Sequence, residues 1–208
     1  VFETTPMTYT LNVQPVTDDQ TPLIVNQTTS GTIGHVGQRD LYTFTLNSPT
    51  ILYFDSLTNN SGLSWSLAGP RGTEVLNRNF TQSDGFSISG TWWTAVAGTY
   101  TLTVDATGDL TGPYSFRLWD QAGAPALTPG AAVSGTLSPA NETDLYRFTV
   151  AAGARVFFDV QAVGGTTPVW RLLDPYGTQV FGPSSMADVD VTTLTSGGTY
   201  TLLVEGAI

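Results

Sequence analysis

Residues suited to nucleophilic or acid–base chemistry are scarce in this sequence of 208 residues, which contains one histidine and no cysteine. A Ser-His-Asp arrangement needs an imidazole as its base, and His35 is the only candidate. We expect His35 to be a solvated residue of a loop between strands. The aligned position of the second repeat described below is Pro139, so a function common to both repeats cannot need an imidazole there. The absence of cysteine rules out thiol catalysis, disulfides and zinc sites of the cysteine type. The sequence therefore predicts that the protein is not an enzyme.

Aspartates near the ends of predicted strands are the candidates for a metal site. Calcium is bound in proteins by several carboxylate and carbonyl oxygens. The candidate ligands are Asp40, Asp55, Asp144, Asp159, Asp188 and Asp190. The alternative is that each aspartate caps a turn or accepts backbone N–H groups at a strand end. Because no EF-hand-like or Gly-Gly-x-Gly-x-Asp loop occurs, we predict no cofactor, with calcium as the alternative.

The adjacent tryptophans Trp92 and Trp93 are the candidate binding residues. Neighbouring residues of a strand face opposite sides of the sheet, so one indole is expected in the core and the other on the surface or at an interface. An exposed indole could stack on a sugar ring or dock a partner. The alternative is that it covers a junction between domains.

An internal repeat organises the elements that must position these residues. The stretches Ser30–Leu46 and Ser134–Val150 are identical at eight positions without a gap, and Asp40 and Asp144 lie 104 residues apart. A later Gly-Thr-Tyr-Thr-Leu block begins at Gly98 and recurs at Gly198. Because a fixed period marks a structural unit that is used more than once, the sequence predicts one domain present twice.

The hydrophobic pattern within each repeat is that of short strands. From Asp40 to Leu46 the apolar and aromatic residues alternate with a period of two, which is typical of a half-buried strand, and a further strand is expected at Phe86–Trp93. The fold class predicted is all-β, with two tandem antiparallel β-sandwich domains of jelly-roll or immunoglobulin-like type and about 100 residues each. The residues expected in the two cores are Tyr42, Phe44, Phe54, Trp65, Tyr100 and Leu102, with their partners Tyr146, Phe148, Phe158, Trp170, Tyr200 and Leu202.

The two ends of the sequence are out of phase with the repeat. Tyr9, Leu11 and Val13 align with the closing strand at Tyr114–Leu118, whereas the second repeat stops before such a strand. We therefore divide the chain into a closing strand of a preceding or neighbouring repeat (1–13), a first sandwich (14–119) and a second sandwich that lacks its last strand (120–208), with a linker expected at Gln14–Gln27. The closing strand either completes the second repeat of a neighbouring subunit or belongs to a preceding repeat of a longer array.

Charge and composition exclude several classes of protein. The formal net charge is −10, only 12% of the residues are charged, and no lysine is present. A nucleic-acid partner requires a basic stripe, so this class is excluded. No apolar run approaches the roughly 20 residues that span a bilayer, so no membrane insertion is expected. Abundant Thr, Ser, Gly and Asn without Lys predict an extracellular or cell-surface location.

The order of the motifs resembles that of the bacterial pre-peptidase C-terminal domain. The resemblance covers nearly the whole chain, twice, and implies jelly-roll sandwiches that are attached to secreted bacterial proteins and carry no catalytic residue. Some related modules bind calcium or an extracellular polymer. Gly69 stands where the family usually has Asp, which leaves the role of that carboxylate open in the first repeat. The shared motifs are Asp40–Phe44 and Asp144–Phe148, the turns Gly69–Gly72 and Asp174–Gly177, and the late strands Ala97–Val104 and Gly197–Val204.

Two functions are compatible with these features. The first is a non-catalytic structural or adhesive module, a subunit or segment of an extracellular fibre or filament that associates with neighbouring copies head to tail by strand complementation. The second is a carbohydrate- or polymer-binding accessory module of a secreted bacterial enzyme, with an extracellular polysaccharide as its partner. The sequence favours the first.

Overall fold

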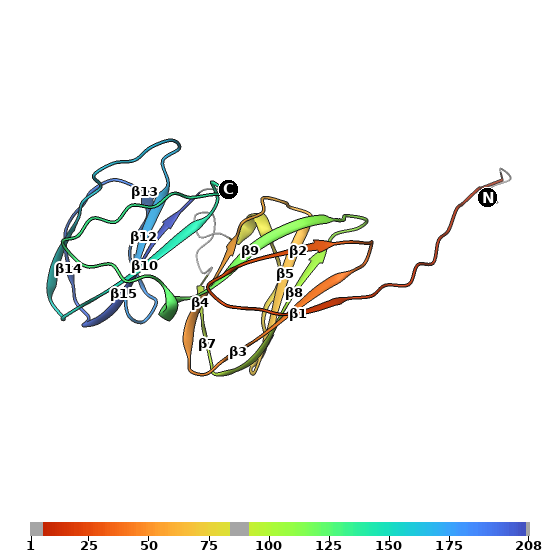
Figure 1. Cartoon of the computed structure of the whole chain (residues 1–208), viewed down its shortest axis with the longest axis horizontal. Helices are drawn as coiled ribbons and strands as arrows, with labels where there is room; N and C mark the ends of the chain where they lie inside the picture. The colour runs from red at the N-terminus through yellow and green to blue at the C-terminus, as the bar shows by residue number, and fades with distance from the viewer. Residues whose placement is uncertain (1–5, 84–91, 207–208) are drawn as a thin grey trace, which may run out of the picture.

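The computed structural model describes residues 6–83 and 92–206 and contains two β-sheet domains arranged end to end (Figure 1). Apart from two short 3-10 turns, η1 (Phe80–Gln82) and η2 (Gln121–Gly123), the regular structure of these residues is β-strand, so the predicted all-β class is confirmed. The first domain contains β1 (Asp19–Pro22), β2 (Thr28–Ile33), β3 (Arg39–Leu46), β4 (Thr50–Ser56), β5 (Leu63–Gly69), β6 (Gly72–Asn79), β7 (Trp92–Ala95), β8 (Gly98–Ala106) and β9 (Gly112–Asp120). The second contains β10 (Thr143–Val150), β11 (Ala154–Phe158), β12 (Val169–Leu173), β13 (Gln179–Ser185), β14 (Val189–Leu194) and β15 (Gly198–Glu205).

The first domain is a sandwich of two sheets. One sheet has the order β1-β3-β8-β5-β6, and the other has the order β2-β9-β4-β7. The pairs are antiparallel except β1 and β3, which run parallel with Asp19 opposite Asp40. The stretch Gln14–Gln27, expected to be only a linker, therefore contains an edge strand, because β1 supplies hydrogen bonds to the otherwise free edge of β3.

The alternating pattern of β3 builds much of the first core. Tyr42, Phe44 and Leu46 are buried, whereas Thr43 and Thr45 between them are exposed. The facing sheet contributes Phe54 of β4, whose ring lies parallel to that of Trp65 with 4.1 Å between the ring centroids. Large aromatic rings from both sheets thus fill the space between them, which is where such rings contribute most to stability.

The larger sheet of the second domain repeats the order found in the first. It runs β10-β15-β12-β13, which matches β3-β8-β5-β6. The register also matches, since Tyr146 pairs with Leu202 as Tyr42 pairs with Leu102. Residue Ala126 forms a parallel bridge with Arg147 beside β10, in the position that β1 takes beside β3.

The smaller sheet of the second domain differs, because it contains only β11 and β14. Residues 132–137, which align with β2, form no strand, and within the described residues no strand pairs with the other edge of β11. One predicted burial is wrong for this reason. Tyr146 is only half-buried, whereas its counterpart Tyr42 is covered by Phe116 of β9, at 5.4 Å between ring centroids.

The remaining predicted core residues are buried, as the alternation indicated. They are Tyr42, Phe44, Phe54, Trp65, Tyr100, Leu102, Phe148, Phe158, Trp170, Tyr200 and Leu202.

Two predicted strands fall partly or wholly outside these elements. Of the strand expected at Phe86–Trp93, residues 86–91 lie outside the described part of the chain, and β7 begins at Trp92. The segment from Pro6 to Val13 is described but has no strand partner and is exposed. In the described residues, no helix is long and apolar enough to cross a membrane.

Candidate functional site

The two domains meet through a small apolar cluster, which we call the junction. The first domain and the turn after it contribute Tyr53, Trp119 and Ala124, and the second domain contributes Leu145, Leu173 and Leu203. All six residues are buried, with no more than 7% of any of them exposed. Burial of this kind fixes the two domains relative to each other more firmly than a polar linker would.

A buried ion pair lies beside the junction. Nε of Arg171 on β12 is 2.7 Å from Oε2 of Glu205 on β15, and the two side chains are 1% and 0% exposed. Burial raises the pKa of Glu205, while the charge and hydrogen bond of Arg171 and the Tyr53 hydroxyl oppose that increase. Because a buried charge that loses its partner is costly, removing either member of this pair should be strongly destabilising.

Hydrogen bonds cross the junction between the two domains. The hydroxyl of Tyr53 lies 3.0 Å from the hydroxyl of Thr143 and 3.5 Å from Oε1 of Glu205. The backbone N–H of Thr143 donates to Oδ1 of Asp55 at 3.1 Å. At the edge, Arg117 and Glu142 form an ion pair at 2.9 Å.

Both candidate tryptophans contact protein. Nε1 of Trp92 donates to the carbonyl oxygen of Gly177 at 3.0 Å, and the Arg171 guanidinium lies 5.2 Å from the centroid of its ring. Trp93 packs against the first core, 5.7 Å from Trp65 between ring centroids. One indole therefore lies at the junction and the other at a core, the arrangement that the opposite faces of a strand require.

The candidate calcium ligands are dispersed through the two domains. Asp55 accepts the N–H of Thr143 at the junction, as described above. On the first domain, the amide Nε2 of Gln38 donates to both Asp19 and Asp40, at 3.1 and 2.7 Å. On the second, Asp188 accepts the N–H of Val160 at 2.9 Å. Asp159 directly precedes Val160 in the chain.

Asp190 accepts the N–H of Val191 at 2.6 Å. Within the described residues, no group of three or more His, Cys, Asp or Glu side chains could hold a metal ion together.

Asp40 belongs to a buried polar cluster at the base of β3. The hydroxyl of Tyr114 donates to Oδ2 of Asp40 at 2.5 Å and lies 2.7 Å from the hydroxyl of Tyr42. Burial raises the pKa of both tyrosines. Gly31 on β2 leaves room for the two hydroxyls, since a Cβ there would lie 2.3 and 2.4 Å from them.

The second domain contains part of the same cluster. Asp144 and Tyr146 occupy the positions of Asp40 and Tyr42, and the Tyr146 hydroxyl lies 3.4 Å from Oδ2 of Asp144. A Cβ on Gly135 would lie 2.7 Å from Asp144 and 2.9 Å from Tyr146. Among the described residues of the second domain, no tyrosine takes the place of Tyr114, and no strand takes the place of β9.

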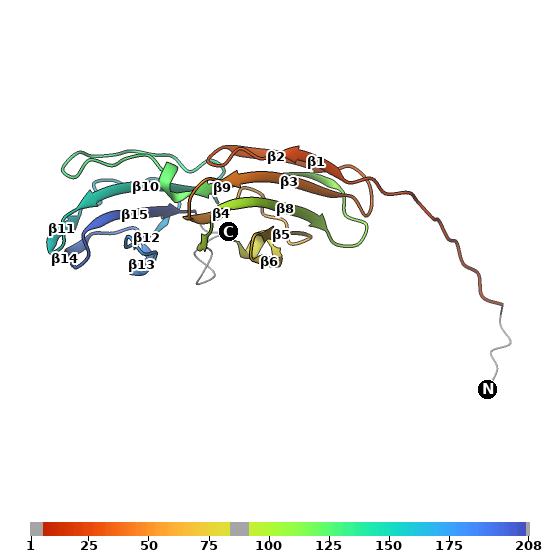
Figure 2. The same ribbon diagram turned by 90° about the horizontal axis from the view of Figure 1, so that it is seen from below.

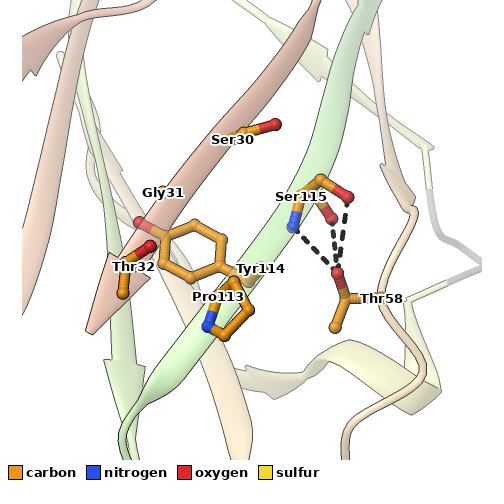
Figure 3. Close-up of a pocket in the computed structure, with 7 residues that line it drawn as sticks. All are labelled: Ser30, Gly31, Thr32, Thr58, Pro113, Tyr114 and Ser115. Atoms are coloured by element: carbon orange, nitrogen blue, oxygen red, sulfur yellow. Dashed lines mark hydrogen bonds between the residues drawn. The ribbon is translucent and has the colours of Figure 1, made fainter. Parts of the chain in front are cut away.

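A surface hollow of about 490 Å³ lies on the outer side of β2 and β9 (Figure 3). Its polar side chains are hydroxyls, and no charged residue lines it. Thr58 holds its edge, accepting the N–H of Ser115 at 2.8 Å. The hollow offers hydrogen bonds, and its one titratable lining residue is Tyr114, whose hydroxyl is engaged with Asp40 in the buried cluster. The seven lining residues are Ser30, Gly31, Thr32, Thr58, Pro113, Tyr114 and Ser115.

The N-terminal segment extends from the end of the first domain that is opposite to the second domain (Figures 1 and 2). Tyr9, Leu11 and Val13 are 90%, 77% and 85% exposed. The chain that follows them is fastened to the first domain. The N–H of Thr17 donates to Nε2 of the half-buried His35 at 3.2 Å, and Asp18 forms an ion pair with Arg39.

Sequence reasoning missed Arg171, Glu205 and Tyr53 as junction residues. The sequence does contain a signal for Arg171, because the aligned position of the first repeat is Ser66. A charged residue in an otherwise apolar strand of only one repeat indicates a contact that only this repeat makes. The roles of Tyr53 and Glu205 depend on the angle between the domains, which the sequence pattern does not contain.

No protein-family model and no curated protein matches the sequence. Among solved structures, the pre-peptidase C-terminal domain of a collagenase from Bacillus anthracis is similar over 51% of this chain and 99% of that chain, with 20% identity and a TM-score of 0.35. PliG, a periplasmic inhibitor of g-type lysozyme from Aeromonas hydrophila, is similar over 50% and 98%, with 12% identity and a TM-score of 0.35. The CUB1-EGF-CUB2 domains of rat MASP-1 are similar over 92% and 95%, with 9% identity and a TM-score of 0.28. The architecture described above rests on the strand pairing within this chain.

Proposed function

We propose that the protein is a non-catalytic extracellular structural module whose copies join head to tail by strand complementation. The extracellular location is proposed from the composition, and the module from the two sandwich domains. The observation that carries the mode of assembly is the open edge of β11, which has no strand partner among the described residues. An unpaired edge beside an apolar core is prone to take up another strand.

The acceptor is the space beside β11 in the second domain. In the first domain, β9 pairs with β2 on one side and with β4 on the other. In the second domain, residues 132–137 and β11 occupy the positions of β2 and β4, and Val156 of β11 is half-buried where Leu52 of β4 is 0% exposed. A strand placed between them would cover this part of the core.

The donor is the segment that carries Tyr9, Leu11 and Val13. These residues align with Tyr114, Phe116 and Leu118 of β9, all three of which are buried. Because the donor segment leaves the first domain on the side away from the second (Figure 2), the acceptor it supplies is that of another copy. A contact of this kind uses different surfaces on the two partners and leaves both ends of the assembly open, which produces a filament.

The energetics favour such a contact. Fully burying an aliphatic or aromatic side chain stabilises by about 1.5–3 kcal/mol, and the donor brings three such side chains together with main-chain hydrogen bonds. The donor is already extended and fastened at its base through Asp18, which forms the ion pair with Arg39. The ordering cost is therefore confined to a short segment.

The test compares Leu11→Asp with Thr10→Asp in the full chain. Both add one negative charge to the donor, but Leu11 aligns with the buried Phe116 and Thr10 with the outward-facing Ser115. We expect Leu11→Asp to abolish assembly and Thr10→Asp to retain it, as measured by light scattering after size exclusion and by electron micrographs. A wild-type chain that stays monomeric, or a Leu11→Asp chain that still assembles, would show that another segment, such as a following part of a longer polypeptide, fills the site.

The polymer-binding function has no specific observation in its favour. Trp92 donates its indole N–H to Gly177 at the junction and Trp93 packs against the first core, so both side chains have structural contacts that account for them.

A further inference from the structure

In the first domain, Asp40, Tyr42 and Gly31 surround the hydroxyl of Tyr114, and their contacts show which groups hold a tyrosine hydroxyl at this place. Oδ2 of Asp40 accepts a hydrogen bond from the Tyr114 hydroxyl, and Oδ1 accepts one from the amide of Gln38 at 2.7 Å. The hydroxyl of Tyr42 lies 2.7 Å from that of Tyr114. Gly31 lies directly over the two hydroxyls, where any Cβ would collide with them.

The second domain presents the counterparts of Asp40, Tyr42 and Gly31, but among its described residues there is no counterpart of Tyr114. A Cβ on Gly135 would lie 2.7 Å from Asp144 and 2.9 Å from Tyr146, so Gly135 covers these two side chains as Gly31 covers the two tyrosine hydroxyls of the first domain, although residues 132–137 form no strand. The only side-chain hydrogen bond to Asp144 among the described residues comes from Tyr146, at the long distance of 3.4 Å.

The position of Gln38 is taken in the second domain by Glu142, which has no N–H to donate when ionised. Asp144 thus lacks both of the strong donors that Asp40 has. Burial and the charge of Glu142 raise the pKa of Asp144, against the opposing charge of Arg117. A half-buried carboxylate with so few donors gains from any hydroxyl brought within reach, because hydrogen bonds to charged groups are stronger than neutral ones.

We propose that Asp144, Tyr146 and Gly135 form a binding site for a tyrosine hydroxyl, and that the occupant is Tyr9 of a second copy of this chain. Tyr9 aligns with Tyr114, and it is the only tyrosine in the exposed segment 6–13. This inference rests on the proposed strand complementation and adds to it a specific recognition element. The apolar residues of the donor supply affinity, whereas the hydroxyl of Tyr9 selects the register, since a shift of one residue would turn it to the other face of the strand.

The experiment separates the hydroxyl from the apolar contacts. The acceptor is the full chain carrying Leu11→Asp, which cannot donate its own strand. The probes are two synthetic peptides with the sequence of residues 6–15, one wild-type and one with Tyr9→Phe, titrated by calorimetry. We expect the wild-type peptide to bind about tenfold more tightly, as for a hydrogen bond to a charged acceptor. The same pair of peptides is then titrated into a chain that also carries Asp144→Ala.

In the Asp144→Ala acceptor, the preference for the tyrosine peptide over the phenylalanine peptide should disappear, because the carboxylate that accepts the hydroxyl is gone. The four affinities form a double-mutant cycle that measures the coupling between Tyr9 and Asp144. Equal binding of the two peptides to the acceptor with Asp144 intact would overturn the tyrosine site while leaving strand complementation in place. A preference that persists in the Asp144→Ala acceptor would overturn the role of Asp144. Failure of both peptides to bind would overturn the proposed function and the site together.

Discussion

The two domains have the same main sheet but different degrees of closure. β3-β8-β5-β6 and β10-β15-β12-β13 agree in order and register. In the first domain β9 closes the second sheet, whereas in the second domain the corresponding place is vacant among the described residues. The order of each main sheet is therefore determined by the pattern within its own strands, while the completeness of each core depends on one further strand.

The presence of β9 in the first domain changes how many core residues are buried and how deeply. The first core comprises eighteen buried residues and the second seven, counted over the described residues. Phe54 is 0% exposed and its counterpart Phe158 is 8% exposed. The indole N–H of Trp65 donates to Ser83 at 2.7 Å, whereas that of Trp170 has no partner among the described residues. The second domain should therefore be the less stable of the two.

The largest expected effect comes from removing one equivalent aromatic side chain from each core. Phe44→Ala and Phe148→Ala should each lower the free energy of unfolding by about 3–5 kcal/mol. Because the second core is smaller, Phe148→Ala should unfold its domain, whereas Phe44→Ala should leave both domains folded. Hydrogen exchange of the β10 and β3 amides measures each domain separately, in the Leu11→Asp chain so that assembly does not contribute. Equal protection of the two strands in the two variants would contradict the difference between the cores.

The junction provides the next largest effect. Trp92→Ala removes the hydrogen bond to Gly177 and the ring that lies over Arg171. Since Trp92 is half-buried rather than buried, we expect a loss of about 2 kcal/mol, less than for a core tryptophan. The readout is thermal unfolding, which should change from one transition to two as the domains lose their coupling.

The matched control for Trp92 is Val191. The strand register places Val191 of β14 in the position of Trp92 of β7, since Thr192 lies opposite Val156 as Trp93 lies opposite Leu52. Val191 is 46% exposed, so Val191→Ala should leave the unfolding transition unchanged. If both variants behave alike, the junction does not couple the domains.

Much of the fold could be predicted because it depends on local pattern. The alternation of Tyr42, Phe44 and Leu46 predicts both the strand and its buried face, and the same spacing recurs in β10. The burial of Tyr146 could not be predicted from its own strand, because it depends on a residue from another strand that would cover it. Local pattern predicts which face of a strand points inward, but burial also requires a partner on that side.

The contacts across the junction could not be predicted from the sequence for a different reason. The pairing of Tyr53 with Thr143 and Glu205 requires the relative orientation of two domains, and no periodicity encodes that angle. β1 was also missed, since Asp19–Pro22 contains a proline and an aspartate and has none of the apolar alternation of a core strand. Its parallel pairing with β3 is accompanied by the ion pair of Asp18 with Arg39 and the hydrogen bond of Gln38 to Asp19, neither of which a pattern of apolar residues indicates.

A smaller and pH-dependent effect distinguishes the two equivalent aspartates. The pKa of Asp144 is raised in the folded state by burial and by the charge of Glu142. Stability from such a group is fully present below the pKa of the unfolded chain and is lost as the pH rises through the folded-state pKa. In the Leu11→Asp background, Asp144→Asn should therefore stabilise at pH 7, by less than about 1 kcal/mol because the group is partly exposed to solvent.

This gain should vanish below about pH 4, near the unfolded pKa of an aspartate. Asp40→Asn should instead destabilise at pH 7, because Asp40 is buried and accepts hydrogen bonds from Gln38 and Tyr114. Denaturant unfolding at pH 4 and pH 7 measures both. An Asp144→Asn variant that is less stable than its parent at neutral pH would contradict the description of Asp144 as a carboxylate short of donors.

The smallest expected effect is that of calcium, and it applies to both domains. In the first, the side-chain amide of Gln38 donates hydrogen bonds to both Asp19 and Asp40, so these carboxylates already have a donor between them. In the second, a backbone N–H of Val160 is similarly directed at Asp188. A bound ion would stabilise the folded state according to its concentration relative to its dissociation constant. We expect a chelator to shift the melting temperature by less than about 2 °C, equivalent to less than about 1 kcal/mol. A decrease of tens of degrees would instead assign these carboxylates to a metal site, and Asp40→Asn and Asp188→Asn would then show which domain holds it.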